Sequence, residues 1–365
     1  MSSRATQAVR AVMRQDVAGS GNAPCAALDL NRDPAMWMDE DIVDRGRLVE
    51  SMAQAWARRS ALHAAVDRCD AYRLMDGRHE GAPGWTVDRY GPCVLVQCFG
   101  RGGAPEELVT ALVELFQERL GADTPVFLKE RFGVGSARER EDGRQVAGPA
   151  LVPAGDDSMG HRPGRLVVNE HGLRFGVDLS YGQNTGLFAD ARSARAWVRA
   201  NSQGRRILNL FSYTGAFGVA ASCGGARSVT NVDRVRSAIE RGRVNYSLNQ
   251  LESDSRTHLR SDVFDYLRRS TRRDESWDGI ILDPPPRPTP GRRRGFDPRR
   301  DTEKLFARAL ELCGDGAWVL GMAAIQSPSL FDLGEQIGEW ERLPTEADFP
   351  VVEGRGRRAA VLQLR

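Results

Sequence analysis

The stretch "NLFSYTGAFGVAA", residues 209–221, decides the fold of this chain. An apolar run leads into Ser212, Tyr213 and Thr214, and Gly215 then opens a series of small helix-forming residues. This order predicts a strand, a tight turn and a helix. Gly215 would let the backbone approach a ligand closely, and Ser212 or Thr214 could form a hydrogen bond at the start of the helix.

The turn lacks the two common phosphate-binding patterns. Neither G-x-G-x-x-G nor G-x-x-x-x-G-K-[ST] occurs in it. A dinucleotide pyrophosphate and a triphosphate are therefore disfavoured, and the turn predicts a nucleotide-like ligand without phosphates.

Strands and helices alternate through the second half of the chain. Strands are predicted at 205–211, 228–233, 258–260, 277–286 and 316–324, and helices at 215–224, 234–251, from Asp262 onward, and at 302–313. Such alternation is typical of an α/β fold, a doubly wound, Rossmann-like domain with a parallel sheet. Ligands of these sheets bind at the carboxyl ends of the strands.

The first half has a different pattern. A helix over 41–65, a hairpin with strands near 85–88 and 93–99, a helix over 105–121 and a strand over 125–131 predict a small α+β domain. We place this substrate-binding domain at 41–165 and the doubly wound domain at 166–365, the latter opening with a hairpin around "NEHG", 169–172. Residues 1–40 are expected to be a poorly ordered tail.

Composition excludes several classes of protein. The chain has 41% hydrophobic and 27% charged residues, and no apolar run long enough to span a membrane or to form a secretory signal. The six cysteines form no C-x-x-C pair and the five histidines show no H-E-x-x-H spacing. We therefore expect a cytoplasmic protein without a zinc site, a disulfide framework or a catalytic metal.

Three acidic residues follow predicted strands in the doubly wound domain. Asp233 lies about 20 residues beyond the turn, where a carboxylate can accept hydrogen bonds from both ribose hydroxyls. Asp262 could bind an adenine amine, and Asp283 would lie beside a reacting sulfonium. A single Asp at such a position is commonly a helix cap. Four features in this order instead favour a pocket for S-adenosylmethionine.

The stretch "RPTPGRRRGFDPRR", 287–300, combines six arginines with an aromatic residue. Arginines can pair with phosphates and an aromatic ring can stack on an unpaired base. We therefore predict a contact with RNA, and the alternative is a solvated loop. The residues assigned to it are Arg287, Arg292, Arg293, Arg294 and Phe296.

Further stretches extend this pattern into a family resemblance. "GQNTGLFADAR" (182–192), "SVTNVD" (228–233), "SDVFDYLRR" (261–269) and "WDGIILDPPP" (277–286) resemble the class I methyltransferases of large-subunit ribosomal RNA, particularly the cytosine-C5 group. "DAYRLMDGRHEGAPGWTVDRYG" (70–91) is similar to the small α+β domain of those enzymes, and "DFPVVEGRGRRAAVLQL" (348–364) resembles their closing strands.

The resemblance implies S-adenosylmethionine as cofactor, ribosomal RNA as substrate and a possible homodimer. It implies a cytoplasmic enzyme whose catalytic stretch is Asp283, Pro284 and Pro285. The implied cofactor contacts are Gln183, Thr185, Phe188, Arg192, Phe211, Tyr213, Thr214, Gly215, Asp233, Asp262 and Asp283. An RNA-binding module of the PUA type, present in many of these enzymes, is not recognisable in residues 1–60.

One departure from the family concerns the chemistry. Members that methylate cytosine C5 have a cysteine just after the fifth strand of the catalytic domain, and this chain has "VLGMAAIQS", 319–327, there. C5 of a pyrimidine is a poor nucleophile until a thiolate adds at C6, so the usual route to that product is not expected. Cys313 is expected to pack in a helix. Two alternatives stay open: methylation of a protein or small molecule, and a degenerate relative that binds RNA or cofactor without turnover.

Overall fold

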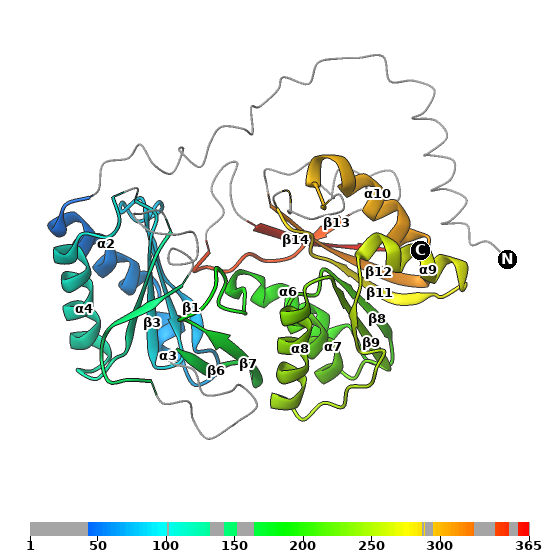
Figure 1. Ribbon diagram of the computed structural model, residues 1–365, viewed down its shortest axis with the longest axis horizontal. Coiled ribbons are helices and arrows are strands. Elements are labelled where there is room, and N and C mark those ends of the chain that lie inside the picture. Colours follow the sequence, from blue (N-terminus) through cyan, green and yellow to red (C-terminus); the bar gives the residue numbers. More distant parts are fainter. Residues whose placement is uncertain are drawn as a thin grey trace, which may run out of the picture. The chain divides into compact units, whose positions relative to one another are not determined.

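The computed structural model describes residues 43–100, 102–131, 142–151, 164–286, 288, 295–324, 340–349 and 357–364. These residues form two compact units (Figure 1). The first unit contains the described residues up to Asp190, together with Ala347–Phe349. The second contains the described residues from Ala191 to Glu346 and from 357 to 364.

The division at 190/191 differs from the predicted boundary at 165/166. The hairpin predicted to open the second unit, β6 (Arg165–Glu170) and β7 (Leu173–Asp178), belongs to the first. Asp70 accepts a hydrogen bond from the Asn169 amide at 2.7 Å, and Cys69 pairs with Glu170 in an antiparallel bridge. These pairings join the hairpin to residues that precede it by about a hundred positions, which local sequence patterns do not reveal.

The second unit is built on a seven-stranded sheet among its described residues, with the order β10-β9-β8-β11-β12-β14-β13. Its strands are β8 (Arg206–Leu210), β9 (Ser228–Asp233), β10 (His258–Arg260), β11 (Trp277–Leu282), β12 (Cys313–Ala324), β13 (Trp340–Arg342) and β14 (Arg357–Gln363). Strands β8 to β12 pair in parallel, whereas β14 pairs antiparallel with both β12 and β13. The predicted doubly wound α/β fold is confirmed.

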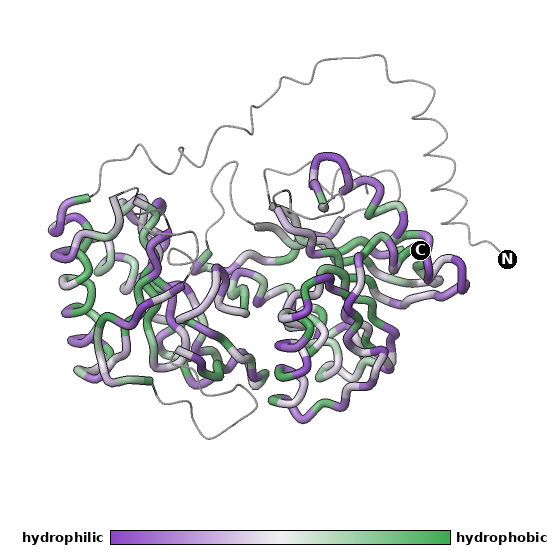
Figure 2. The backbone as a smooth tube through the Cα atoms, viewed as in Figure 1, coloured by the Kyte–Doolittle hydropathy of each residue, from purple (hydrophilic) through white to green (hydrophobic). Residues whose placement is uncertain are grey.

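Helices cover both faces of this sheet, as Figure 1 shows. They are α6 (Arg192–Ala200), α7 (Ala216–Cys223), α8 (Arg236–Leu248), α9 (Val263–Arg272) and α10 (Pro298–Leu310). One buried cluster joins α6 and α7 to the sheet, and a second joins α9 and α10 to it. Figure 2 shows hydrophobic residues along the central strands and hydrophilic residues along α10. Because β11 is buried on both faces, its run "GIIL" is continuously apolar.

The first unit contains a five-stranded sheet with the order β1-β2-β3-β4-β5 among its described residues. The strands are β1 (Ala71–Asp76), β2 (Trp85–Tyr90), β3 (Cys93–Cys98), β4 (Val126–Glu130) and β5 (Arg144–Ala147). Its helices are α2 (Arg45–Arg58), α3 (Ser60–Ala64) and α4 (Glu106–Leu120), and α2 and α4 share a buried cluster with the sheet. The helix predicted over 41–65 is therefore two helices, and β1 and β5 were not predicted.

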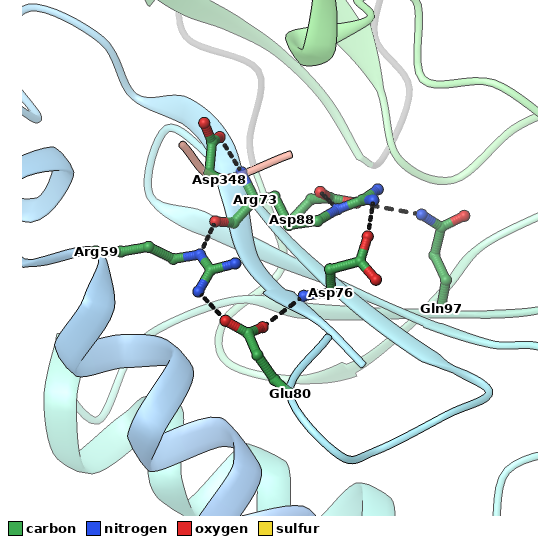
Figure 3. Close-up of polar contacts among 7 residues, drawn as sticks. All are labelled: Arg59, Arg73, Asp76, Glu80, Asp88, Gln97 and Asp348. Atoms are coloured by element: carbon green, nitrogen blue, oxygen red, sulfur yellow. Dashed lines mark hydrogen bonds and ion pairs between the residues drawn. The ribbon is translucent and has the colours of Figure 1, made fainter. Parts of the chain in front are cut away.

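Arg59 lies between these two helices, and its side chain enters the core of the first unit. The Arg59 guanidinium donates to the backbone oxygen of Arg73 at 2.7 Å and to the Glu80 carboxylate (Figure 3). Glu80 in turn accepts from the Asp76 amide at 2.8 Å. The side chains of Arg59 and Glu80 are 4% and 2% exposed, so each charge has its partner in place of water.

Arg73 continues this network on the other side of β1. Its Nε donates to Asp88 at 2.9 Å and its Nη1 to Asp76 at 3.1 Å (Figure 3). Its backbone amide donates to Asp348 at 2.9 Å, and its guanidinium lies 4.4 Å from the centre of the Phe349 ring. Residues from near the end of the chain thus complete the first unit.

We expect Glu80→Gln to lower the free energy of unfolding by about 3–5 kcal/mol, because Arg59 would keep a buried charge without its counterion. Glu50→Gln is the matched control, since Glu50 is exposed on α2 and accepts a hydrogen bond from the exposed Gln54; it should change stability by less than about 0.5 kcal/mol. Urea denaturation measures both. Equal stabilities for the two variants would contradict the importance of this ion pair.

Candidate functional site

The candidate site lies where the strand order of the second unit reverses. From β8 the chain proceeds outward to β9 and β10, and it then returns to the other side of β8 as β11. The helices that follow β8 and β11 therefore diverge to opposite faces, which leaves a crevice at the carboxyl ends of these two strands. The segments Phe211–Gly215, Asp233–Val235, Ser261–Asp262 and Asp283–Pro286 follow the ends of the four neighbouring strands.

The turn Phe211–Gly215 has an unusual backbone. Phe211, Tyr213 and Gly215 have φ values of 56°, 47° and 72°, so left-handed residues alternate with Ser212 and Thr214. For aromatic side chains this conformation costs free energy, and such strain is concentrated at functional sites. Gly215 is the N-cap of α7 and offers no side chain to the first turn. The amide groups at the start of α7 can therefore donate to an anionic ligand group.

Asp233 joins this turn to the end of β9. Its Oδ2 accepts from the Tyr213 amide at 2.9 Å and its Oδ1 accepts from the Val235 amide at 2.8 Å. Burial raises the pKa of Asp233, although the hydrogen bonds from the Val235 and Tyr213 amides oppose the shift. A carboxylate has about four acceptor positions, so the two oxygens can still accept from two hydroxyl groups.

Val235 was not assigned to the site from the sequence. Its side chain is 47% exposed, which is unusual for a large aliphatic residue, and it lies two residues after Asp233. An exposed apolar side chain beside a hydrogen-bonding carboxylate suits a flat ring that is attached to a sugar. The signal in the sequence is weak, because a valine at the end of a strand is expected to be buried.

Buried polar side chains hold the turn from below. Asn245, on α8 and 1% exposed, donates to the backbone oxygen of Thr214 at 2.8 Å. Asn231 accepts from Asn209 at 2.8 Å and donates to the Tyr246 hydroxyl at 3.1 Å. The sequence offered one clue, since Asn245 continues the buried face of α8, where an amide needs a partner.

Helix α7 packs so closely on this layer that it requires a glycine. A Cβ atom on Gly218 would lie 2.2 Å from Oδ1 of Asn231. Gly218 thus lets the helix begin directly above the sheet, and this position fixes the turn that precedes it.

His258 lies in the same layer, at the start of β10. It is 3% exposed, its ring is 4.6 Å from that of Tyr246 in an edge-to-face arrangement, and its Cε1 is 3.7 Å from the position of a Cβ on Gly215. Burial, together with the charge of Arg243, lowers the pKa of His258 to about 4. The imidazole is therefore neutral at physiological pH and packs as an uncharged ring.

The two other predicted carboxylates end adjacent strands of the sheet. Asp262 is the N-cap of α9, and its Oδ1 accepts from the amides of Phe264 and Asp265 at 3.0 and 3.1 Å. The capping role that we weighed for such residues is thus observed, and a contact with adenine stays a prediction. Asp283 follows β11 and is half-buried, as are Pro284 and Pro285.

Phe296 requires a correction. It was predicted to stack on an RNA base, but its side chain is 8% exposed and belongs to the core of the second unit. Its ring lies 5.0 Å from Phe211 and 6.4 Å from Phe264. These contacts leave little surface for a base. Arg287, Arg292, Arg293 and Arg294 lie outside the described residues.

Three predicted cofactor contacts belong to the first unit. Gln183 and Phe188 are exposed, and the backbone oxygen of Gln183 accepts from Arg131 at 2.9 Å. Thr185 is buried, and its hydroxyl lies 3.1 Å from the Tyr90 hydroxyl and donates to the Leu187 backbone at 3.3 Å. These partners hold the Thr185 side chain in place, and its contact with the cofactor stays a prediction.

Arg192 also has a structural partner. Its Nε and Nη2 donate to Glu346 at 3.1 and 2.7 Å, and its side chain is 5% exposed. The Ser193 hydroxyl donates to the same carboxylate at 2.5 Å. Arg192 thus ties the start of α6 to Glu346, and its contact with the cofactor stays a prediction.

The cysteines of the second unit lie away from the site. Cys223 ends α7 and Cys313 begins β12. Both positions therefore lie toward the amino ends of the parallel strands, opposite to the turn. Burial raises the pKa of the Cys313 thiol to about 12. The described residues contain no cluster of His, Cys, Asp or Glu that could hold a metal ion, and none of their helices is long and apolar enough to cross a membrane.

Comparisons with known proteins agree on one family. Residues 159–337 match the model of the S-adenosylmethionine-dependent methyltransferases. The ribosomal RNA large subunit methyltransferase I of Erwinia tasmaniensis is 36% identical over 251 residues, which cover 68% of this chain and 59% of that relative. The enzyme of the same name from Serratia proteamaculans is 32% identical over 311 residues, covering 79% of this chain and 72% of the relative.

Solved structures share the fold. The crystal structure of a protein described as a methyltransferase and complexed with SAH has a TM-score of 0.73 and 23% identity, covering 88% of this chain and 82% of that chain. A protein of Streptococcus mutans described as a SAM-dependent methyltransferase has a TM-score of 0.71, with the same identity and coverage. At this identity the likeness concerns the fold alone.

The low pKa of His258 makes stability depend on pH. The unfolded chain takes up a proton on this residue near its ordinary pKa of 6.5, whereas the folded chain does so only near 4. The unfolded state therefore binds more protons between these values, and about 3 kcal/mol of stability should be lost as the pH falls through this window.

We expect His258→Asn to flatten the pH dependence of the free energy of unfolding between pH 6.5 and 4. The exposed hairpin residue His171, changed to Asn, provides the control and should keep the wild-type slope. Denaturant titrations at several pH values measure both. A wild-type slope in His258→Asn would show that this imidazole is not the group responsible.

Proposed function

The chain belongs to the family of S-adenosylmethionine-dependent methyltransferases, and on this premise we propose that it methylates a base in large-subunit ribosomal RNA. The observation that carries the proposal is the strained turn Phe211–Gly215, held by Asp233 at the point where the strand order reverses. Turns of this kind, followed by an uncapped helix and an acidic strand end, suit a nucleoside with a charged tail.

The residues present fit the cofactor in three respects. The amides at the start of α7 would receive the carboxylate of the methionine part, since no side chain caps them. Asp233 would accept from the two ribose hydroxyls, and Val235 would pack on the adenine ring. Ser212 adds a buried hydroxyl for which the described residues offer no hydrogen-bond partner, as expected where a ligand completes the site.

Catalysis would consist mainly of orientation. S-adenosylmethionine supplies an electrophilic methyl group on a sulfonium, so the protein need only hold an acceptor in line with it and exclude water. The rigid layer of Asn245, Asn231 and Tyr246 keeps the turn in place. Asp283 and the adjoining Pro284 and Pro285, at the end of β11, would form the side of the crevice from which the acceptor is oriented.

The RNA substrate is proposed from the relatives and from charge. Two relatives bear the name of a large-subunit ribosomal RNA methyltransferase, and the Arg-rich segment 287–300 follows directly on the catalytic stretch. Arg287, Arg292, Arg293 and Arg294 would pair with phosphates of the RNA. An RNA substrate of this kind would place the activity in the cytoplasm, and a homodimer stays a prediction.

Asp233→Ala should weaken S-adenosylmethionine binding by about 100-fold or more, because each lost hydrogen bond to a charged group contributes about 1.5–3 kcal/mol. Asp233→Asn keeps one acceptor oxygen and should fall between this variant and the wild type. Asp315→Ala is the control, since Asp315 is exposed near the opposite end of the sheet. Isothermal titration calorimetry gives the three dissociation constants. An unchanged value for Asp233→Ala would remove this residue from the site.

The activity itself is tested with cofactor that carries a labelled methyl group. We expect label to enter large-subunit ribosomal RNA from cells that lack this gene, and much less to enter the same RNA from wild-type cells, whose target is already methylated. Ribosomal RNA of the small subunit serves as the control substrate. Label found in protein or in small molecules, with none in RNA, would refute the proposed substrate, and cofactor binding without any transfer would identify a binding protein.

A further inference from the structure

Residues 178–186 of the first unit form a loop whose backbone is held by charged side chains. Lys129 Nζ donates to the backbone oxygen of Gly182 at 2.7 Å, and the Asp142 carboxylate accepts from the amide of Gly182 at 2.7 Å. Lys129 is one of only two lysines in the chain, and its side chain is 0% exposed. A buried ammonium group costs free energy unless its hydrogens are bonded. Its position against Gly182 therefore indicates a loop that is held in one place.

The part of the loop before Gly182 is held in the same way. Asp178 Oδ1 accepts from the amide of Tyr181 at 3.1 Å. The segment beside the loop packs so closely that a Cβ atom on Gly143 would lie 2.1 Å from the backbone oxygen of Leu179. These bonds go to the backbone of the loop and do not depend on the Tyr181 side chain.

The loop presents an aromatic ring to solvent. The large hydrophobic side chains that are exposed among the described residues are Tyr181 at 47%, Phe188 at 38% and Val235 at 47%. Phe188 and Val235 have predicted contacts with the cofactor, whereas Tyr181 has no role in the site described above. A ring on a fixed backbone has little freedom to lose when a flat partner stacks on it.

Two arginines lie beside the same loop. Arg131 Nη1 donates to the backbone oxygen of Gln183 at 2.9 Å. Arg144 follows Gly143, whose amide donates to the backbone oxygen of Ser180 at 3.1 Å, and the Arg144 side chain is 62% exposed. An exposed ring next to guanidinium groups is the combination that binds single-stranded nucleic acid, since the ring stacks on a base and the cations pair with phosphates.

The polar residues around Tyr181 favour a nucleic acid over a protein partner. Gln183 and Asn184 are exposed between Tyr181 and Phe188, so the two rings form no continuous apolar surface along the chain. Interfaces with proteins are marked by contiguous apolar patches.

We propose that Tyr181 stacks on an unpaired base of the RNA substrate, and that Arg131 and Arg144 bind phosphates next to that base. This inference rests on the proposed function and adds to it an RNA contact made by the first unit. The faces of a paired base are covered by its neighbours in the helix, so the contact requires a single-stranded or looped stretch of RNA. Every base has a flat face, so stacking by itself selects no sequence.

The dissociation constant for a fluorescent single-stranded RNA oligonucleotide, measured by fluorescence anisotropy, tests the stacking. Tyr181→Ala should raise this constant about 10-fold, whereas Tyr181→Phe keeps the ring and should stay within about twofold of the wild type. Urea denaturation should give equal stabilities for both variants, because the bond from residue 181 to Asp178 uses the backbone amide. Equal RNA affinities for Tyr181→Ala and the wild type would overturn the inference.

The salt dependence of binding tests the arginines. Arg144→Gln should lower the slope of log Kd against log salt concentration by about 0.7, the value for one phosphate of a single strand. Arg174→Gln is the matched control, since Arg174 is exposed near the start of β7, at the other end of that strand from Asp178. Equal slopes for the two variants would remove Arg144 from the surface.

Photo-crosslinking locates the stacked base directly. An oligonucleotide that contains 5-iodouridine reacts under near-ultraviolet light with an aromatic side chain on which the base stacks, and mass spectrometry of the peptides should find the bond on Tyr181. Bonds to other residues alone would overturn the inference, and the proposed function would stand if the wild type still transfers methyl groups to RNA. Absence of both RNA binding and methyl transfer would overturn the two together. A wild-type RNA affinity of Tyr181→Ala, with self-association lost in analytical ultracentrifugation, would assign the ring to a second copy of the chain instead.

Discussion

The hydrogen bond from the Tyr213 amide to the Asp233 carboxylate is the interaction on which the site depends. It joins the segments that follow two neighbouring parallel strands, and it can form only because β8 and β9 run in the same direction and end at the same edge. A hydrogen bond to a charged acceptor contributes more than a neutral one. It therefore helps to offset the free-energy cost of the left-handed backbone at Phe211 and Tyr213. This backbone forms the turn that leads into the start of α7.

Beneath this turn the protein uses polar groups where an apolar core would be simpler. Asn209, Asn231, Asn245 and Tyr246 are buried and hydrogen bonded to one another or to the backbone, and His258 lies among them as a neutral ring. The hydrogen bonds among these side chains favour a single arrangement, because a shift of one of them would break the bonds that it makes with its neighbours. The turn is thus preorganised, with little freedom to lose when a ligand binds.

Regular patterns explain what could be predicted from the sequence. The apolar run of β11, the glycine at 215 and the acidic ends of β9 and β11 are local features, and they predicted the strands and the turn that the structure has. Thr185, Arg192 and Phe296 contact residues that are distant in the sequence. Thr185 is hydrogen bonded to Tyr90, Arg192 pairs with Glu346, and Phe296 packs on Phe211. No local pattern in the sequence reveals those pairings. Helix α6 was missed for a related reason, since it buries the charged residues Arg192 and Arg195.

The first unit is discontinuous in the sequence. Its core strand β1 receives a hydrogen bond partner from Asp348, which is fully buried, and a stacking partner from Phe349. The second unit is encoded almost entirely between these residues and Asp190. During synthesis, the half of the protein that leaves the ribosome first must therefore wait for nearly the whole chain before it is complete. A polypeptide shortened before residue 347 would lack part of its first unit, although the break would lie near its far end.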